Sequence, residues 1–202
     1  MTSARDKDRI ARYLRRSGIA RSRELERIGV SRKQIRRFVD RGLIERIGWG
    51  LYRLPGVLLT ERHGLAEAAR RVPGGVVCLL SALRFHELTT QSPFEIWMAI
   101  ERKAWRPPRG NPPLRLVFAS GAAFREGVEK HRVGGVLVPV YGIAKTVVDC
   151  FKYRNKIGLD VALEALRDAW RRKRLTMDEI DRFARICRVE RVMRPYLEAL
   201  VA

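Results

Sequence analysis

The 202-residue sequence predicts an α+β fold, with helices at both ends of the chain and a small mixed sheet between them. Apolar residues recur at helical spacing in the first 40 residues and again after residue 143. Between these regions stand apolar runs typical of strands, among them FEIWMAI and LRLVF. The turn-like LPGV at residues 54–57 predicts a boundary between domains of residues 1–56 and 57–202.

Three helices and a hairpin are expected in the first domain. RIARYLRRSG repeats apolar residues at helical spacing and ends in glycine, and RSRELERIG is a short second helix. A third helix begins at Ser31, because Ser31 and Gln34 have the spacing of a capping box. LIERIGWGLYRL then predicts two short strands around the glycines and tryptophan of residues 48–50.

Charge is concentrated in this first domain. The chain carries a formal net charge of +20, and residues 1–56 supply half of it, with sixteen Lys and Arg against six Asp and Glu. A high arginine content can reflect GC-rich coding, so the position of the charge is more informative than its total. A basic segment attracts phosphate backbones, which favours nucleic acid as the partner of this domain.

The third helix separates apolar from basic residues. Ile35, Phe38 and Val39 share one face and are expected to pack on the first two helices. The opposite face carries two rows of cations, which are Arg32 with Arg36 and Lys33 with Arg37. Such a face suits the major groove, where arginine binds guanine, and Gln34 can read adenine if the cap leaves it free.

The hairpin that follows has the features of a wing. Arg46 and Arg53 flank its tip, where Trp49 is expected either to reach DNA or to fold back over the core. This order of elements predicts a winged helix-turn-helix; the alternatives are a winged helix for protein contacts and an ordinary solvated basic helix. The residues expected to contact DNA are Arg21, Arg23, Arg32, Lys33, Gln34, Arg36, Arg37, Arg46, Trp49 and Arg53.

The second domain is expected to hold about four strands and several helices. RHGLAEAARR and VVCLLSALRFHEL have helical patterns, although VVCLL can also begin as a strand, and KHRVGGVLVPV predicts a hairpin at its glycine pair. Four C-terminal helices follow, of which the second is expected to be capped by Asp160 and the third by Thr176. The polar run KYRNKIG is either a solvated loop or a second nucleic-acid or partner contact, through Lys152, Arg154, Asn155 and Lys156.

The sequence does not favour an enzyme. Lys145 and Asp149 have the spacing of an ordinary pair on a helix, and no phosphate-binding loop, dinucleotide fingerprint or serine-nucleophile motif is present. Three scattered cysteines predict buried, reduced thiols, so no metal site or cofactor is expected. Without a membrane-length apolar run or a secretory leader, the protein is expected in the cytoplasm.

The stretch ELERIGVSRKQIRRFVDRGLIERIGWGLYRLPG closely resembles the N-terminal winged-helix domain of the AbiEi family of bacterial antitoxins. The matching hairpin residues are Gly42, Leu43, Arg46, Gly50, Tyr52, Leu54, Pro55 and Gly56. LLSALRFHELTTQSP and GIAKTVVDCFKYRNKIGLDVALEALRDA resemble the second domain of the same family, so the resemblance covers nearly the whole chain.

The resemblance implies a transcriptional autorepressor and antitoxin of a type IV toxin–antitoxin, or abortive-infection, operon. Its winged helix would bind inverted repeats in the operon promoter, and the second domain would support repression and counter a nucleotidyltransferase toxin, with or without direct contact. The alternative is a DNA- or RNA-binding regulator that is not an antitoxin and whose second domain binds a protein partner.

Overall fold

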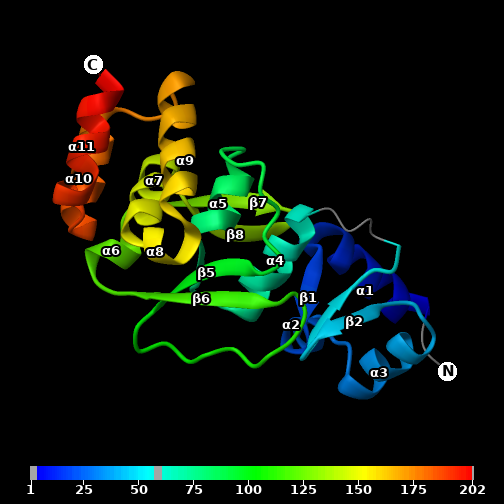
Figure 1. Ribbon diagram of the computed structural model, residues 1–202. Helices are drawn as coiled ribbons and strands as arrows, with labels where there is room; N and C mark the ends of the chain where they lie inside the picture. The colour runs from blue at the N-terminus through cyan, green and yellow to red at the C-terminus, as the bar shows by residue number, and fades with distance from the viewer. Residues whose placement is uncertain (1–3, 57–60, 202) are drawn as a thin grey trace. The chain divides into compact units, whose positions relative to one another are not determined.

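The computed structural model describes residues 4–56 and 61–201 and shows a mixed α/β protein with two sheets (Figure 1). It divides into two compact units. The first comprises Met1–Pro73, Pro107–Pro112 and Arg132–Val138, and the second comprises Gly74–Arg106, Pro113–His131 and Pro139–Ala202. The predicted boundary after residue 56 adjoins residues 57–60, which lie outside the described residues, and it stays a prediction.

The first unit contains the expected helices and hairpin. Its elements are α1 (Ala4–Ser17), β1 (Ile19–Arg21), α2 (Ser22–Arg27), α3 (Arg32–Asp40), β2 (Glu45–Gly48), β3 (Leu51–Arg53) and α4 (Glu61–Arg71). β3 pairs antiparallel with both β1 and β2, so the sheet order is β1-β3-β2. The sequence did not predict β1, a strand of three residues whose pairing partner lies about thirty residues later in the chain.

One apolar core joins these elements. Ile10 and Leu14 of α1, Leu25 of α2, and Ile35 and Phe38 of α3 are all buried to 2% exposure or less. This confirms the predicted apolar face of the third helix. Because α3 is held by this one face, its opposite face is left to solvent.

A five-stranded sheet has the order β6-β5-β4-β8-β7. Its strands are β4 (Val76–Val77), β5 (Ile96–Glu101), β6 (Leu114–Ala119), β7 (Val128–Val133) and β8 (Val136–Tyr141). The β5–β6 and β4–β8 pairs are parallel, whereas β4 and β5 are antiparallel. VVCLL therefore begins as a strand, and the expected hairpin turns on Gly134 and Gly135, whose φ angles of +53° and +81° favour glycine.

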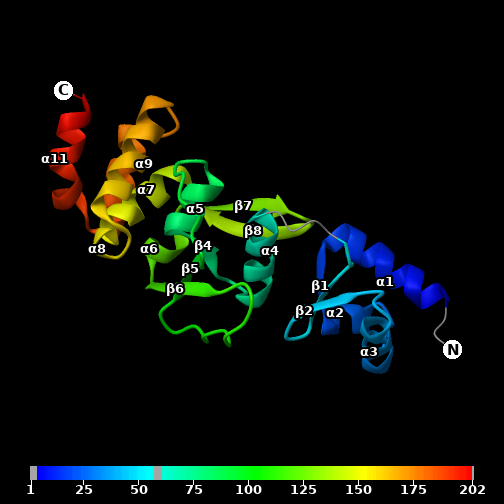
Figure 2. The same ribbon diagram turned by 45° about the vertical axis from the view of Figure 1, so that its right-hand side comes forward.

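Helices of the second unit supply most of its core. They are α5 (Leu79–Phe85), α6 (Ala122–Arg125), α7 (Ile143–Lys152), α8 (Arg154–Ile157), α9 (Leu159–Arg171), α10 (Met177–Cys187) and α11 (Glu190–Val201). The buried helix α7 packs against α5, α9 and α10. Figures 1 and 2 show α7 grouped with the last three helices of the chain, α9, α10 and α11. No helix of the described ranges is long and apolar enough to cross a membrane.

Two local predictions for these helices have different outcomes. The Thr176 cap is confirmed, because Thr176 Oγ1 accepts from the Glu179 amide at 3.3 Å and Glu179 Oε2 accepts from the Thr176 amide at 2.8 Å. The Asp160 cap was wrong. Gly158, with φ +96°, occupies the cap position of α9, and Asp160 lies inside the first turn.

The pair expected to be ordinary, Lys145 with Asp149, is instead buried at the centre of the second unit. The two residues are 1% and 5% exposed, and Lys145 Nζ donates to Asp149 Oδ2. Cys187 Sγ donates to Asp149 Oδ1 at 3.4 Å, and Lys145 Nζ lies 4.1 Å from the centre of the Tyr141 ring. An ion pair in this position belongs to the core, where losing one partner costs far more than on a surface.

All three cysteines are buried and free, as predicted. Burial raises the pKa of the Cys78 and Cys150 thiols well above its ordinary value, with the nearby Asp149 carboxylate adding to the effect. Burial also raises the pKa of Cys187, to about 11. These thiols are therefore protonated at neutral pH and act as small apolar side chains.

Candidate nucleic-acid interface

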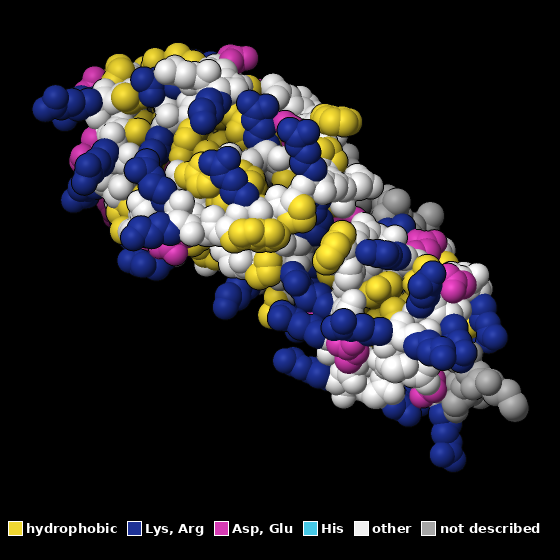
Figure 3. All heavy atoms as spheres, turned by 90° about the horizontal axis from the view of Figure 1, so that it is seen from below, with side chains coloured by type: hydrophobic (Ala, Val, Ile, Leu, Met, Phe, Trp, Pro, Cys, Tyr) yellow, Lys and Arg dark blue, Asp and Glu magenta, His cyan; other side chains and the backbone are white. Residues whose placement is uncertain are grey.

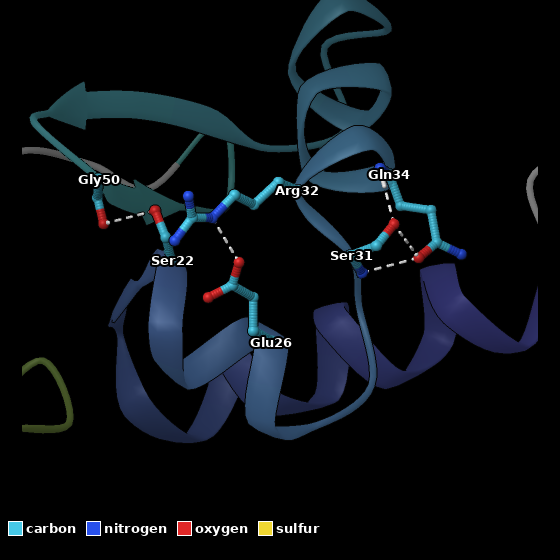
Figure 4. Close-up of polar contacts among 6 residues, drawn as sticks. All are labelled: Ser22, Glu26, Ser31, Arg32, Gln34 and Gly50. Atoms are coloured by element: carbon cyan, nitrogen blue, oxygen red, sulfur yellow. Dashed lines mark hydrogen bonds and ion pairs between the residues drawn. The ribbon is translucent and has the colours of Figure 1, made fainter.

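The start of α3 is fixed by a capping box, as the sequence predicted (Figure 4). Ser31 Oγ accepts from the Gln34 amide at 3.3 Å, and Gln34 Oε1 accepts from the Ser31 amide at 2.8 Å. The other end of the Gln34 side chain donates from Nε2 to Asp6 Oδ2 of α1 at 2.6 Å. Gln34 is thus not free to read adenine; it ties α3 to its cap and to α1.

Arg32 lies at the edge of the basic face and has a carboxylate neighbour. Its Nε donates to Glu26 Oε1 of α2 at 2.6 Å, which Figure 4 shows beside the α2–α3 turn. The Arg32 side chain is 84% exposed and that of Glu26 is 34% exposed. An ion pair this exposed contributes at most about 1 kcal/mol, so a phosphate can replace the carboxylate.

Lys33, Arg36 and Arg37 form the centre of the basic face. All three are exposed, and within residues 4–56 and 61–201 none forms an ion pair with a carboxylate. Because the other side of α3 is buried, these three cations project away from the core. We call Lys33, Arg36 and Arg37 the α3 basic face.

Lysine and arginine side chains are abundant over much of the surface in Figure 3, where acidic side chains are sparse. On the face shown in Figure 3, the excess of Lys and Arg over Asp and Glu lies at the surface. A surface of this kind attracts polyanions over a distance of about a Debye length, roughly 10 Å at 0.1 M salt.

The β2–β3 hairpin exposes its aromatic tip. Trp49 is 90% exposed, which excludes the interpretation that it folds back as a lid on the core. Beside it, Gly50 O accepts from the Ser22 amide at 2.8 Å and anchors the tip to the start of α2. Arg46 is exposed on the same hairpin, where its Nε donates to Gly48 O at 3.3 Å.

Arg53, expected beside the tip as a DNA contact, is engaged inside the unit. Its side chain is 15% exposed and pairs with Glu45 Oε2 at 2.9 Å and Glu67 Oε1 at 3.1 Å. Burial raises the pKa of Glu67, an effect opposed by the charges of Arg53 and Arg71. Arg53 therefore holds the hairpin to α4 and is not available to a phosphate.

Arg21 ends β1 and Arg23 lies in α2, so neither belongs to α3. Arg21 is partly buried and donates from Nη2 to the carbonyl oxygen of Arg70, whereas Arg23 is exposed. Both line a cleft together with Arg70 and Arg132. Sequence reasoning missed these last two residues, because nothing in the local pattern places positions 70 and 132 beside position 21.

The basic run of the second unit forms a short helical turn, α8, instead of a loop. Lys152 and Lys156 are exposed, with their Nζ atoms 6.0 and 5.6 Å from the centre of the Tyr153 ring. Arg154 donates from Nη1 to Phe151 O at 3.0 Å, while Asn155 is exposed. Lys152, Asn155 and Lys156 are thus on the surface, and Arg154 partly serves the end of α7.

Within the described parts of the chain, no group of three or more His, Cys, Asp or Glu residues could hold a metal ion. The most prominent feature of the first unit is a capped helix with a buried apolar face and an exposed basic face, followed by an antiparallel hairpin. This combination is typical of the class of nucleic-acid-binding regulators.

Comparison with known proteins shows a family likeness for part of the first unit. Residues 8–55 match the model of a family described as "Transcriptional regulator, AbiEi antitoxin", which confirms the predicted resemblance for this segment. The resemblance of the second domain to the same family stays a prediction. No curated protein matches the sequence. Among solved structures, the RV2827C protein from Mycobacterium tuberculosis is similar at a TM-score of 0.63 and 14% identity, over 89% of this chain and 71% of that one. At this identity the likeness concerns the fold alone.

Proposed function

We propose that the chain is a transcriptional repressor whose first unit is a winged helix-turn-helix. In this proposal α3 is the recognition helix in the major groove, and the β2–β3 hairpin is the wing, which carries Trp49 and Arg46 to the adjacent backbone or minor groove. The observation that supports it most is the α3 basic face, three exposed cations opposite a face buried in the core.

The family match over residues 8–55 supports a more specific role. We propose that the protein represses its own operon by binding inverted repeats in the promoter, and that it acts as the antitoxin to a nucleotidyltransferase toxin encoded beside it. On this proposal the second unit contributes to neutralisation and has no catalytic activity.

Removing the basic face tests DNA binding. Substituting Lys33, Arg36 and Arg37 with Ala should abolish binding to promoter DNA, because each good base contact contributes about 1–3 kcal/mol. The matched control substitutes Arg125, Arg167 and Arg191 with Ala, which are three exposed arginines of the second unit. This control removes three positive charges, the same number as the α3 variant. Binding is measured by fluorescence anisotropy at physiological salt, against the promoter duplex and a scrambled duplex.

The control variant should keep both its affinity and its preference for the promoter. Equal losses in the two variants would show that only total charge matters, and the proposed recognition role of α3 would be wrong. Binding of the wild type to both duplexes with the same affinity would favour the alternative of a regulator that does not read this sequence. Co-expression with the neighbouring toxin gene tests the antitoxin role separately, by restored growth.

A further inference from the structure

A second basic feature of the first unit is built from elements other than α3. It is a cleft of about 370 Å³ with walls from the start of α2, the end of α4 and the β7–β8 turn. We call it the arginine cleft, because Arg21, Arg23, Arg70 and Arg132 line it. Every residue of its lining belongs to the first unit.

The turn that forms one wall is packed tightly against the end of α1. A Cβ atom added at Gly135 would lie 2.5 Å from the carbonyl oxygen of Arg16, and one added at Gly18 would lie 1.6 Å from the carbonyl oxygen of Gly134. Backbone approaches this close leave no room for a side chain. The wall that carries Arg132 is therefore part of the packed unit.

Positive charge in the arginine cleft exceeds the negative charge beside it. Glu24 pairs with Arg70 Nη1 at 2.9 Å and also accepts from the Arg21 amide at 2.7 Å. Burial lowers the pKa of Arg21, and the charges of Arg23 and Arg70 lower it further against the opposing effect of Glu24. Arg132 is exposed and forms no ion pair with any carboxylate of the described residues.

One hydrogen-bond donor at the cleft is buried and unused. Arg70 Nε has no partner in the described structure, although the side chain of this residue pairs through Nη1 and its carbonyl oxygen accepts from Arg21. Leaving a buried polar group unsatisfied costs about 1–3 kcal/mol, and more for a charged one. An oxyanion in the cleft would neutralise the crowded arginines, and a shift of the Arg70 side chain toward it would give this donor a partner.

We propose that the arginine cleft is a phosphate-binding site. Guanidinium groups match the spacing of phosphate oxygens and bind them in bidentate fashion. The volume is at the lower end of small-molecule sites, which span about 300–1,000 Å³. Val136 and Leu137 add an apolar wall, with Leu137 55% exposed, that suits a sugar or base attached to the phosphate. The phosphate comes either from a free nucleotide or from the backbone of a bound duplex.

The first experiment measures free phosphates. Isothermal titration calorimetry at low ionic strength, with pyrophosphate and ADP as probes, should show binding to the wild type. Arg132→Gln and Arg70→Gln should each weaken it about tenfold or more, the loss expected for one charged hydrogen bond. Arg125→Gln, an exposed arginine of the second unit, is the control for net charge. Arg70→Lys keeps the charge but loses the planar fork and Nε, so it should fail like Arg70→Gln.

The second experiment measures a 20-base-pair duplex across a range of salt concentrations. The slope of log K against log salt is negative for a protein that binds DNA phosphates. If the cleft holds a backbone phosphate, Arg132→Gln should reduce the magnitude of this slope by about one, while Arg125→Gln should leave it unchanged. A loss confined to pyrophosphate and ADP would assign the cleft to a free nucleotide.

The variants leave α3 intact, so failure here does not touch the proposed recognition role of that helix. Arg132 is exposed, and its variant is expected to keep the wild-type melting temperature, which separates loss of binding from loss of fold. The proposal would be overturned if the cleft variants and Arg125→Gln behaved alike with both kinds of probe.

Discussion

Lys145 and Asp149 should show the strong coupling of a buried ion pair. Asp149 has two side-chain partners in the structure, Lys145 and Cys187, and Lys145 has Asp149 and the Tyr141 ring. Lys145→Met leaves the carboxylate with only a weak thiol donor, and Asp149→Leu leaves the ammonium with only the ring. Each change should cost about 3–5 kcal/mol, the usual cost of stranding a buried charge.

Replacing both residues together should restore most of that loss. The double variant Lys145→Met with Asp149→Leu buries no charge and keeps a similar number of side-chain heavy atoms, so its stability should return to within about 1 kcal/mol of the wild type or exceed it. The cycle would then give a coupling energy of several kcal/mol, well above the ~0.5 kcal/mol scatter of independent sites.

The assay is urea unfolding of the four proteins, followed by far-UV circular dichroism and by tryptophan fluorescence, to which the buried Trp97 of the second unit contributes. A surface pair, Arg182→Met with Glu126→Leu, is the control, because the two side chains are 62% and 41% exposed and their coupling should be below about 1 kcal/mol. Single variants as stable as the wild type, or a double variant as unstable as the two singles combined, would refute the reasoning.

Three further predictions concern the first unit. Ser31→Ala should lower its free energy of unfolding by about 1 kcal/mol, because the Gln34 amide loses its cap, and Ser31→Asp should restore it in thermal melts. Trp49→Ala should change the free energy of unfolding by less than about 0.5 kcal/mol, since the side chain is 90% exposed. The same variant should weaken duplex binding in anisotropy measurements. A large drop in its melting temperature would contradict the exposed position of Trp49. Glu26→Gln removes the carboxylate beside Arg32, so duplex affinity should rise and the salt slope should steepen by up to about one; an unchanged slope would show that Arg32 does not meet a phosphate.

The sequence was most informative where structure depends on neighbouring residues. The capping box at Ser31 and the helical spacing of Ile35 and Phe38 were confirmed, because both are properties of one short segment. From the same segment the exposed cations followed directly, since the residues opposite a buried stripe face solvent.

Features that depend on distant residues could not be predicted in this way. β1 is a strand of three residues, too short for any alternation to show, and it exists only through its pairing. For β4, a strand of two residues, the sequence left helix and strand open, and the pairing decided between them. Arg53 is a residue type expected in a wing that contacts DNA, but its side chain pairs with Glu67, fourteen positions later in the chain. Lys145 and Asp149 have the same spacing whether a helix is exposed or buried, so their burial followed only from the packing of α7.

The hydrogen bond from Gln34 to Asp6 has a consequence for how such a protein diversifies. It assigns position 34 to the architecture of the unit, together with Ser31, Ile35 and Phe38. The exposed side chains of Lys33, Arg36 and Arg37 form no ion pair with a carboxylate of the described residues. The two sets of positions alternate along one helix but do not overlap. Substitutions at the three outward positions can therefore accumulate at little cost in stability, and on the proposed function related operons could acquire separate promoter sequences without exchanging the fold.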